Sequence, residues 1–102
     1  MYAVTIKLAS QVLSKYNLND TSAFNLISHF LTSQGFTEER QGYYVGSTKT
    51  NAVTTMLAIQ RLNKTYEWVG QATSDIQMLR IEEVNDLMPL LNTQKVKKLA
   101  YA

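Results

Sequence analysis

The stretch FTEERQGYYVG, residues 36–46, decides the fold of this chain. It contains two short extended pieces, Phe36–Arg40 and Tyr43–Gly46, joined at Gln41-Gly42. A glycine between two extended pieces is typical of a tight turn, so we expect a β-hairpin here, although its alternation of apolar and polar residues is imperfect. The hairpin lies between two segments with helical periodicity.

An amphipathic helix is predicted on each side of this hairpin. The first helix covers about Thr21–Gln34, where residues 20–22 offer N-cap oxygens and Gly35 can end the helix in a left-handed turn. The second covers about Thr50–Lys64, with residues 47–50 as capping candidates. Apolar side chains recur at three- and four-residue spacing in both segments: Ala23, Phe24, Leu26, Ile27, Phe30 and Leu31, then Ala52, Val53, Met56, Leu57, Ile59 and Leu62.

Two outer strands complete the pattern. The chain opens MYAVTIKL, residues 1–8, and its last clear strand is Asp75–Ile81. Successive side chains of a strand point to opposite faces. One face of the first strand therefore carries Tyr2, Val4, Ile6 and Leu8, and the other carries Ala3, Thr5 and Lys7. The first set suits a core, so Lys7 is expected on the opposite, uncovered face.

The element order is therefore β-α-β-β-α-β, which predicts an α+β, ferredoxin-like domain: one antiparallel sheet with both helices on one face. We assign residues 1–91 to this single domain and residues 92–102 to a basic C-terminal tail. The class of residues 9–20 is unclear, between a helical turn and a packed loop. Residues 66–70 are expected to be a connection anchored by an aromatic side chain, and Asp86–Leu91 a short terminal helix.

Composition narrows the function classes. The chain has 102 residues, of which 45% are hydrophobic and 18% charged, and its net charge is +2. These are the values of one globular domain. It has no cysteine, which excludes disulfides, thiolate metal ligands and cysteine nucleophiles. No apolar run approaches a membrane span of about 20 residues and the N-terminus lacks a secretion signal, so we expect no membrane partner and a cytoplasmic location.

Few residues carry chemistry on their own. His29 falls on the polar side of the first helix, so a surface role is favoured over catalysis. Asp75 begins the last strand, where a turn carboxylate that bonds its own backbone is favoured over a functional group at the edge of the open face. Tyr43 or Tyr44 is a candidate to stack on a base, but burial in a contact between two sheets is favoured. No metal site is predicted.

Several stretches together resemble the virulence-associated protein D (VapD) family. MYAVTIKL resembles the family's M-Y-A-x-x-F-D-L start, and the other matching pieces follow in order over about residues 1–91: Gly35-Phe36, Gln41-Gly42, Ala58-Ile59 with Leu62 and Trp68, Ser74-Asp75-Ile76, Arg80 to Glu83, and Asp86-Leu87. The family is similar in fold to small CRISPR-associated ferredoxin-like nucleases. The resemblance implies ribonuclease activity, often within toxin–antitoxin systems, and a homodimer in which two sheets meet through their open faces.

The same resemblance implies a catalytic site in which most groups are substituted. Lys7 stands where the family has a carboxylate, Tyr43 where it has a serine, and Gln77 where it has an arginine, whereas Asp75 is retained. An ammonium neither holds a metal nor accepts a proton at neutral pH. Glutamine lacks the cation suited to a scissile phosphate. We therefore expect RNA cleavage to be lost or reduced, in preference to a rearranged active site.

Two hypotheses remain open. The first is a homodimer that binds or cleaves RNA, with Lys7, Arg40, Lys95, Lys97 and Lys98 as candidate RNA contacts. No cofactor is certain, and Mg²⁺ is the one to test if the protein is active. The second is a catalytically inert interaction protein, a decoy, regulator or antitoxin-type partner without an RNA role, which would bind a toxin–antitoxin or CRISPR-system protein.

Overall fold

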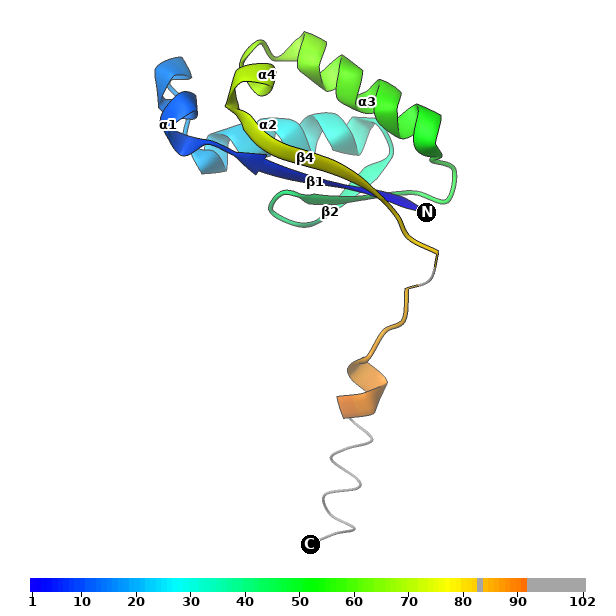
Figure 1. Cartoon of the computed structure of the whole chain (residues 1–102). Coiled ribbons are helices and arrows are strands. Elements are labelled where there is room, and N and C mark those ends of the chain that lie inside the picture. Colours follow the sequence, from blue (N-terminus) through cyan, green and yellow to red (C-terminus); the bar gives the residue numbers. More distant parts are fainter. Residues whose placement is uncertain (83, 92–102) are drawn as a thin grey trace, which may run out of the picture.

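The computed structural model describes residues 1–82 and 84–91. Figure 1 shows a sheet with its main helices on one side, as predicted. The elements in chain order are β1 (Tyr2–Leu8), α1 (Ser10–Leu13), the 3-10 helix η1 (Ser14–Tyr16), α2 (Asp20–Ser33), β2 (Phe36–Arg40), β3 (Tyr43–Gly46), α3 (Ala52–Thr65), α4 (Trp68–Ala72) and β4 (Thr73–Arg80).

The sheet has the strand order β2-β3-β1-β4, and every pairing in it is antiparallel. This confirms the ferredoxin-like α+β fold, and the hairpin strands have the predicted bounds. Gly42 supplies the turn between them with a φ of 83°, a conformation that residues with a side chain rarely adopt. The first and last strands of the sequence, β1 and β4, pair along their whole length. β1 lies inside the sheet, and β4 stands last in the strand order and is an edge strand.

The helix starts were predicted at the wrong capping residues. Asn19 caps α2: its side chain accepts a hydrogen bond from the Ser22 N–H at 2.8 Å, and the Ser22 hydroxyl accepts one from the Asn19 N–H at 3.0 Å. Asn51 and Thr54 form the same reciprocal pair at the start of α3. Both helices therefore begin with a capping box whose third helical residue is a hydroxyl amino acid.

Two short helices were not predicted. α1 and η1 resolve the unclear segment 9–20, and α4 replaces much of the expected connection at residues 66–70. Trp68, Val69 and Ala72 of α4 are buried, so tertiary packing stabilises a helix that is too short to show a period in the sequence. β4 accordingly begins at Thr73 rather than at Asp75.

The core lies between the sheet and the two long helices. Val4 and Ile6 of β1 point into it, as predicted, together with Tyr44 of β3. α2 contributes Ala23, Ile27 and Leu31, and α3 contributes Ala58 and Leu62. Trp68 is the buried aromatic anchor expected after the second helix. Because the helices cover only this face, the side chains between those core positions of each strand are left on the opposite face.

The C-terminal region is described in part. Residues 88–91 form a helical turn near the predicted terminal helix, with Pro89 in its first turn, where a proline is tolerated. The predicted basic tail, residues 92–102, lies outside the described residues, as do Lys95, Lys97 and Lys98. Within the described part of the chain, no helix is long and apolar enough to cross a membrane.

Candidate functional site on the open face

The open face of the sheet is built from rows of directly opposite residues. Such residues point to the same side of a sheet, so the strand register fixes each row. The first row is Thr37, Val45, Ala3 and Leu79, read across β2, β3, β1 and β4. The second is Arg40, Tyr43, Thr5 and Gln77, and the third pairs Lys7 with Asp75. The face therefore changes from apolar to charged along β1.

The apolar row is less exposed to solvent than expected for the uncovered face of a sheet. Ala3 has no exposed surface although it lies on the uncovered face. Its small side chain stands between Val45 and Leu79, which are both larger and cover it. Leu79 remains 39% exposed, and the exposed Met1 precedes β1 at the same end of the sheet.

The charged row brings together two residues that the sequence placed 68 positions apart. Lys7 and Asp75 are directly opposite in the β1–β4 pairing. Lys7 is exposed and Asp75 is half-buried. No ion pair within 4.0 Å joins them, since the one such pair in the described part of the chain is Arg80 with Glu82 at 3.4 Å. Lys7 and Asp75 are therefore neighbours across the strand pair, but their side chains form no direct salt bridge.

The backbone beside this pair is irregular. The register shifts between Lys7 and Leu8, and the Ser74 hydroxyl donates a hydrogen bond to the Lys7 carbonyl at 3.2 Å. Gln77 follows on the same face, and its side-chain amide donates to the Asp75 carboxylate at 3.4 Å. Asp75 thus has a neutral donor on one side and an ammonium across the strand pair. This arrangement can accept a proton or bind a cation at the carboxylate, and can bind a phosphate at Lys7.

Arg40 and Tyr43 form a second polar unit at the other side of the face. The Arg40 guanidinium carbon lies 5.0 Å from the centre of the Tyr43 ring, within the range of a cation–π contact. A hollow of about 600 Å³ opens beside them. We call it the β2–β3 hollow, and its polar lining is Thr37, Glu39, Arg40, Tyr43, Ser47 and Thr48. The rest of its lining includes the apolar residues Met1, Val45, Ile81 and Val84. No sequence pattern predicted this hollow, because it combines residues that only the strand pairing brings together.

Of the two candidate tyrosines, only Tyr43 is on the open face. Tyr44 is buried under the helices, where its hydroxyl lies 2.9 Å from the Ser28 hydroxyl. Burial raises the pKa of the Tyr44 phenol, the hydrogen bond with Ser28 opposes that effect, and the nearby Glu38 carboxylate adds to it. Tyr44 is therefore a structural residue. His29 lies exposed on α2, away from the open face, as the sequence indicated.

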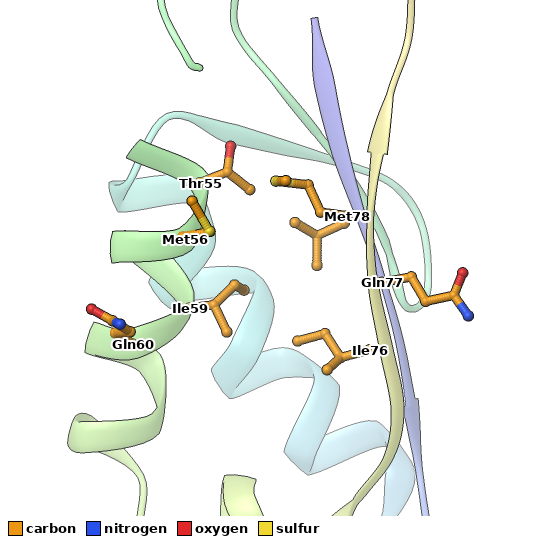
Figure 2. A pocket seen from close by; sticks show the side chains of 8 residues that line it. Thr55, Met56, Ile59, Gln60, Ile76, Gln77 and Met78 are labelled. Atoms are coloured by element: carbon orange, nitrogen blue, oxygen red, sulfur yellow. The ribbon is translucent and has the colours of Figure 1, made fainter. Parts of the chain in front are cut away.

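A further hollow lies on the helical side of the edge strand. Figure 2 shows a space of about 310 Å³ between α3 and β4, with Met56 and Ile59 on one side and Ile76 and Met78 on the other. Gln77 points away from this space, toward the open face. We call it the α3–β4 groove. It is mainly apolar, its lining residues include no acid or cation, and the Thr55 hydroxyl donates to the Asn51 carbonyl, so it offers a contact surface rather than a reaction centre.

The described residues contain no group of three or more His, Asp or Glu side chains placed to hold a metal ion. The charged row contains one carboxylate, that of Asp75. A metal ion bound there would need its other ligands from RNA, water or a second copy of the chain. Arg40 and Lys7 are the described members of the candidate RNA contacts, and both lie on the open face.

Two known proteins are similar to this chain over most of its length. The chain is 35% identical to "Endoribonuclease VapD 2" of Riemerella anatipestifer over 94 residues, which is 90% of this chain and 100% of that protein. It is also 35% identical to "Endoribonuclease VapD homolog" of Helicobacter pylori over 91 residues, 89% of this chain and 96% of that protein. No protein-family model matches the chain.

Proposed function

Because the chain belongs to the VapD endoribonuclease family, we propose that it acts on RNA as a cytoplasmic homodimer, and that its cleavage activity is lost or reduced. The observation that carries this proposal is that Lys7, Arg40 and Asp75 lie together on the uncovered face of the sheet. Cations on one face bind the phosphates of RNA in a salt-dependent way. A carboxylate among them is the natural proton acceptor for attack on a phosphodiester.

The reduced activity follows from the substituted positions. Lys7 replaces the acid that the family resemblance implies, so the charged row holds one carboxylate where two would stand. Gln77, which bonds Asp75, replaces an arginine and cannot neutralise developing phosphate charge. What remains is electrostatic stabilisation of the phosphate by Lys7, with Asp75 as the only acid or base of the row.

The homodimer is supported by the apolar end of the open face. Leu79, Val45 and the flanking Met1 and Ile81 surround the closed Ala3. A partner sheet that covers these side chains would also close over part of the β2–β3 hollow, which Met1, Val45 and Ile81 line, and would leave Lys7 and Asp75 at the charged end for RNA. A stable pair of this kind buries about 1,200–2,000 Å² in total.

The decisive experiment incubates the purified protein with mixed RNA in the presence of Mg²⁺, Mn²⁺ or a chelator. Asp75→Ala is the matched inactive variant. We expect weak, Asp75-dependent cleavage or none, together with RNA binding that weakens as salt is raised. Rapid cleavage that survives in Asp75→Ala would place the active site elsewhere and reject this reading of Lys7 and Asp75.

The alternative function, an inert interaction protein, is favoured by a different observation. The α3–β4 groove leaves Met56, Ile76 and Met78 between 39% and 51% exposed beside β4, which is an edge strand of the sheet among the described residues. An edge strand next to an apolar groove can accept an extended segment of a protein partner. On this hypothesis a toxin–antitoxin or CRISPR-system protein would bind there. The protein would then show no salt-dependent retention of RNA, and Met78→Glu would abolish its partner binding.

A further inference from the structure

We propose that residues 84–91, which we call the C-terminal arm, bind in the α3–β4 groove of a second copy of the chain. The inference rests on the homodimer of the proposed function and adds to it a second contact, on the helical side of the sheet. It arises from the apolar side chains of the arm, from the uncovered groove, and from the direction in which the arm leaves β4.

The arm is apolar and largely exposed. Its large apolar side chains are between 53% and 68% exposed: Val84, Leu87, Met88, Leu90 and Leu91. The Asp86 carboxylate accepts a hydrogen bond from the Met88 N–H at 3.0 Å. The Leu87 carbonyl accepts one from the Leu90 N–H at 3.0 Å, so the arm contains a capped helical turn. A single turn is too short to be stable alone in water, and contiguous exposed apolar side chains mark a contact surface.

The groove offers a complementary surface. Its exposed lining includes Met56 and Met78, whose unbranched thioether side chains suit adaptable contacts. A second hollow of about 340 Å³ shares Ile59 and Ile76 with the groove and continues toward α4. Along β4 the two hollows extend from Met78 to Thr73, about 17 Å of strand, whereas a helical turn of four residues is about 6 Å long. The groove is therefore long enough for the arm, and an apolar helix in an apolar groove is a common mode of recognition.

The direction of the arm selects a second copy rather than the same chain. The α3–β4 groove lies on the helical side of the sheet, whereas Figure 1 shows the arm leaving β4 on the side of the open face. Two sheets packed face to face lie about 10 Å apart, and the stretch from Ile81 to Leu91 can span up to about 33 Å. An arm that starts at the edge strand of one sheet can therefore pass the edge strand of the other and reach its helical side. Two-fold symmetry would place both arms in this way.

The test is site-directed cross-linking, which suits this chain because it has no cysteine. A tagged Met56→Cys protein and an untagged Leu91→Cys protein are mixed until subunits exchange, and are then treated with a short bis-maleimide. We expect a covalent product that contains one chain of each kind. Arg61→Cys is the matched control for the groove, because Arg61 is exposed on the same helix but bonds Gln34 and does not line the groove. It should give at most a trace of the product.

Met78→Asp, added to the Met56→Cys chain, separates the arm contact from the open-face contact. It should abolish the cross-link while light scattering still gives the mass of two chains, because Met78 faces the groove and not the open face. Met78→Leu, which keeps an apolar side chain, should cross-link like the parent protein. Thermal unfolding of each variant identifies any that fails to fold.

The outcomes distinguish the arm from the dimer. A two-chain mass with no cross-link above the Arg61→Cys level would reject the arm contact, leave the homodimer standing and leave the groove to a protein partner. A one-chain mass for the unmodified protein would reject the homodimer and the arm contact with it. In the double variant Met56→Cys/Leu91→Cys, cross-links formed only within one chain would place the arm in its own groove and overturn the proposal.

Discussion

Lys7 is the positively charged residue of the charged row. It stands directly opposite Asp75, and the two carry opposite charges without a salt bridge within 4.0 Å. A long lysine stem can lie along a strand surface while its ammonium stays in water, so Lys7 needs no direct partner in the isolated chain. The same position lets it bind a phosphate that approaches the open face.

Lys7→Asp should therefore destabilise the protein without restoring activity. It would place two carboxylates directly opposite each other, and a like-charge pair across two strands costs up to about 1 kcal/mol of the free energy of unfolding. Denaturant unfolding at neutral pH measures this loss, with Lys7→Gln as the control that removes the charge alone. Efficient RNA cleavage by Lys7→Asp alone would contradict the role given to Tyr43 and Gln77; the combination with Tyr43→Ser and Gln77→Arg has the better prospect.

The buried phenol of Tyr44 should make the free energy of unfolding fall at alkaline pH. Burial raises the pKa of its phenol above the ordinary value of 10.0, so the folded chain holds the proton more tightly than the unfolded chain. This contribution to stability is fully present below about pH 10 and is lost as the pH rises through the higher pKa of the folded state. The free energy of unfolding should fall more steeply above pH 10 in the wild type than in Tyr44→Phe. Equal slopes would show that the phenol ionises without penalty. At neutral pH Tyr44→Phe loses the bond to Ser28 and should cost about 1 kcal/mol.

At the scale of elements, the strand bounds of the β2–β3 hairpin could be predicted because a glycine marks its turn. Gln41-Gly42 fixed both strand ends, and two periodic segments fixed α2 and α3 to within about two residues. The caps could not be chosen among neighbouring Asn, Asp, Ser and Thr residues, since all of them can accept the required hydrogen bond. α4 and the bulge at Glu39 arise from tertiary packing and strand register, which leave no periodic signal.

The turn glycine gives a sharp prediction. Gly42 has a φ of 83°, and a Cβ added there would lie 2.6 Å from the carbonyl oxygen of Ile6. The Gly42 carbonyl also accepts a hydrogen bond from the Ile6 N–H at 2.8 Å, so the turn cannot move away without breaking a link to β1. Gly42→Ala should lower the free energy of unfolding by about 2 kcal/mol or more, through strain and overpacking together. Gly35→Ala is the comparison, because a Cβ at Gly35 would meet only ordinary contacts at 3.9 Å despite its φ of 93°. A smaller loss for Gly42→Ala than for Gly35→Ala would contradict this account.

At the scale of the whole molecule, the sequence predicted which residues of β1 lie on the open face, but not which residues of the other strands lie opposite them. The alternation of MYAVTIKL placed Thr5 and Lys7 on it, and element order brought Asp75 to the same surface. The register, which decides that Lys7 meets Asp75 and that Arg40 shares a row with Tyr43, depends on strand pairing between distant segments. That pairing also sets the gradient from an apolar end to a charged end, which suggests where a second copy and an RNA would each bind.

The last prediction is that two copies of the chain pair through the apolar end of the open face. Leu79 is 39% exposed at the edge strand, beside the closed Ala3, and its burial against the same residue of a second copy would contribute hydrophobic stabilisation at the two-fold axis. Light scattering at micromolar protein should give twice the chain mass. Leu79→Asp should shift the mass to that of one chain, because it would bring two carboxylates together in a contact that excludes water. Met78→Asp is the matched control: it lies next in β4 with 42% exposure but faces the α3–β4 groove, so it should leave the dimer intact. A monomer mass for the wild type, or equal dissociation by both variants, would place the contact elsewhere.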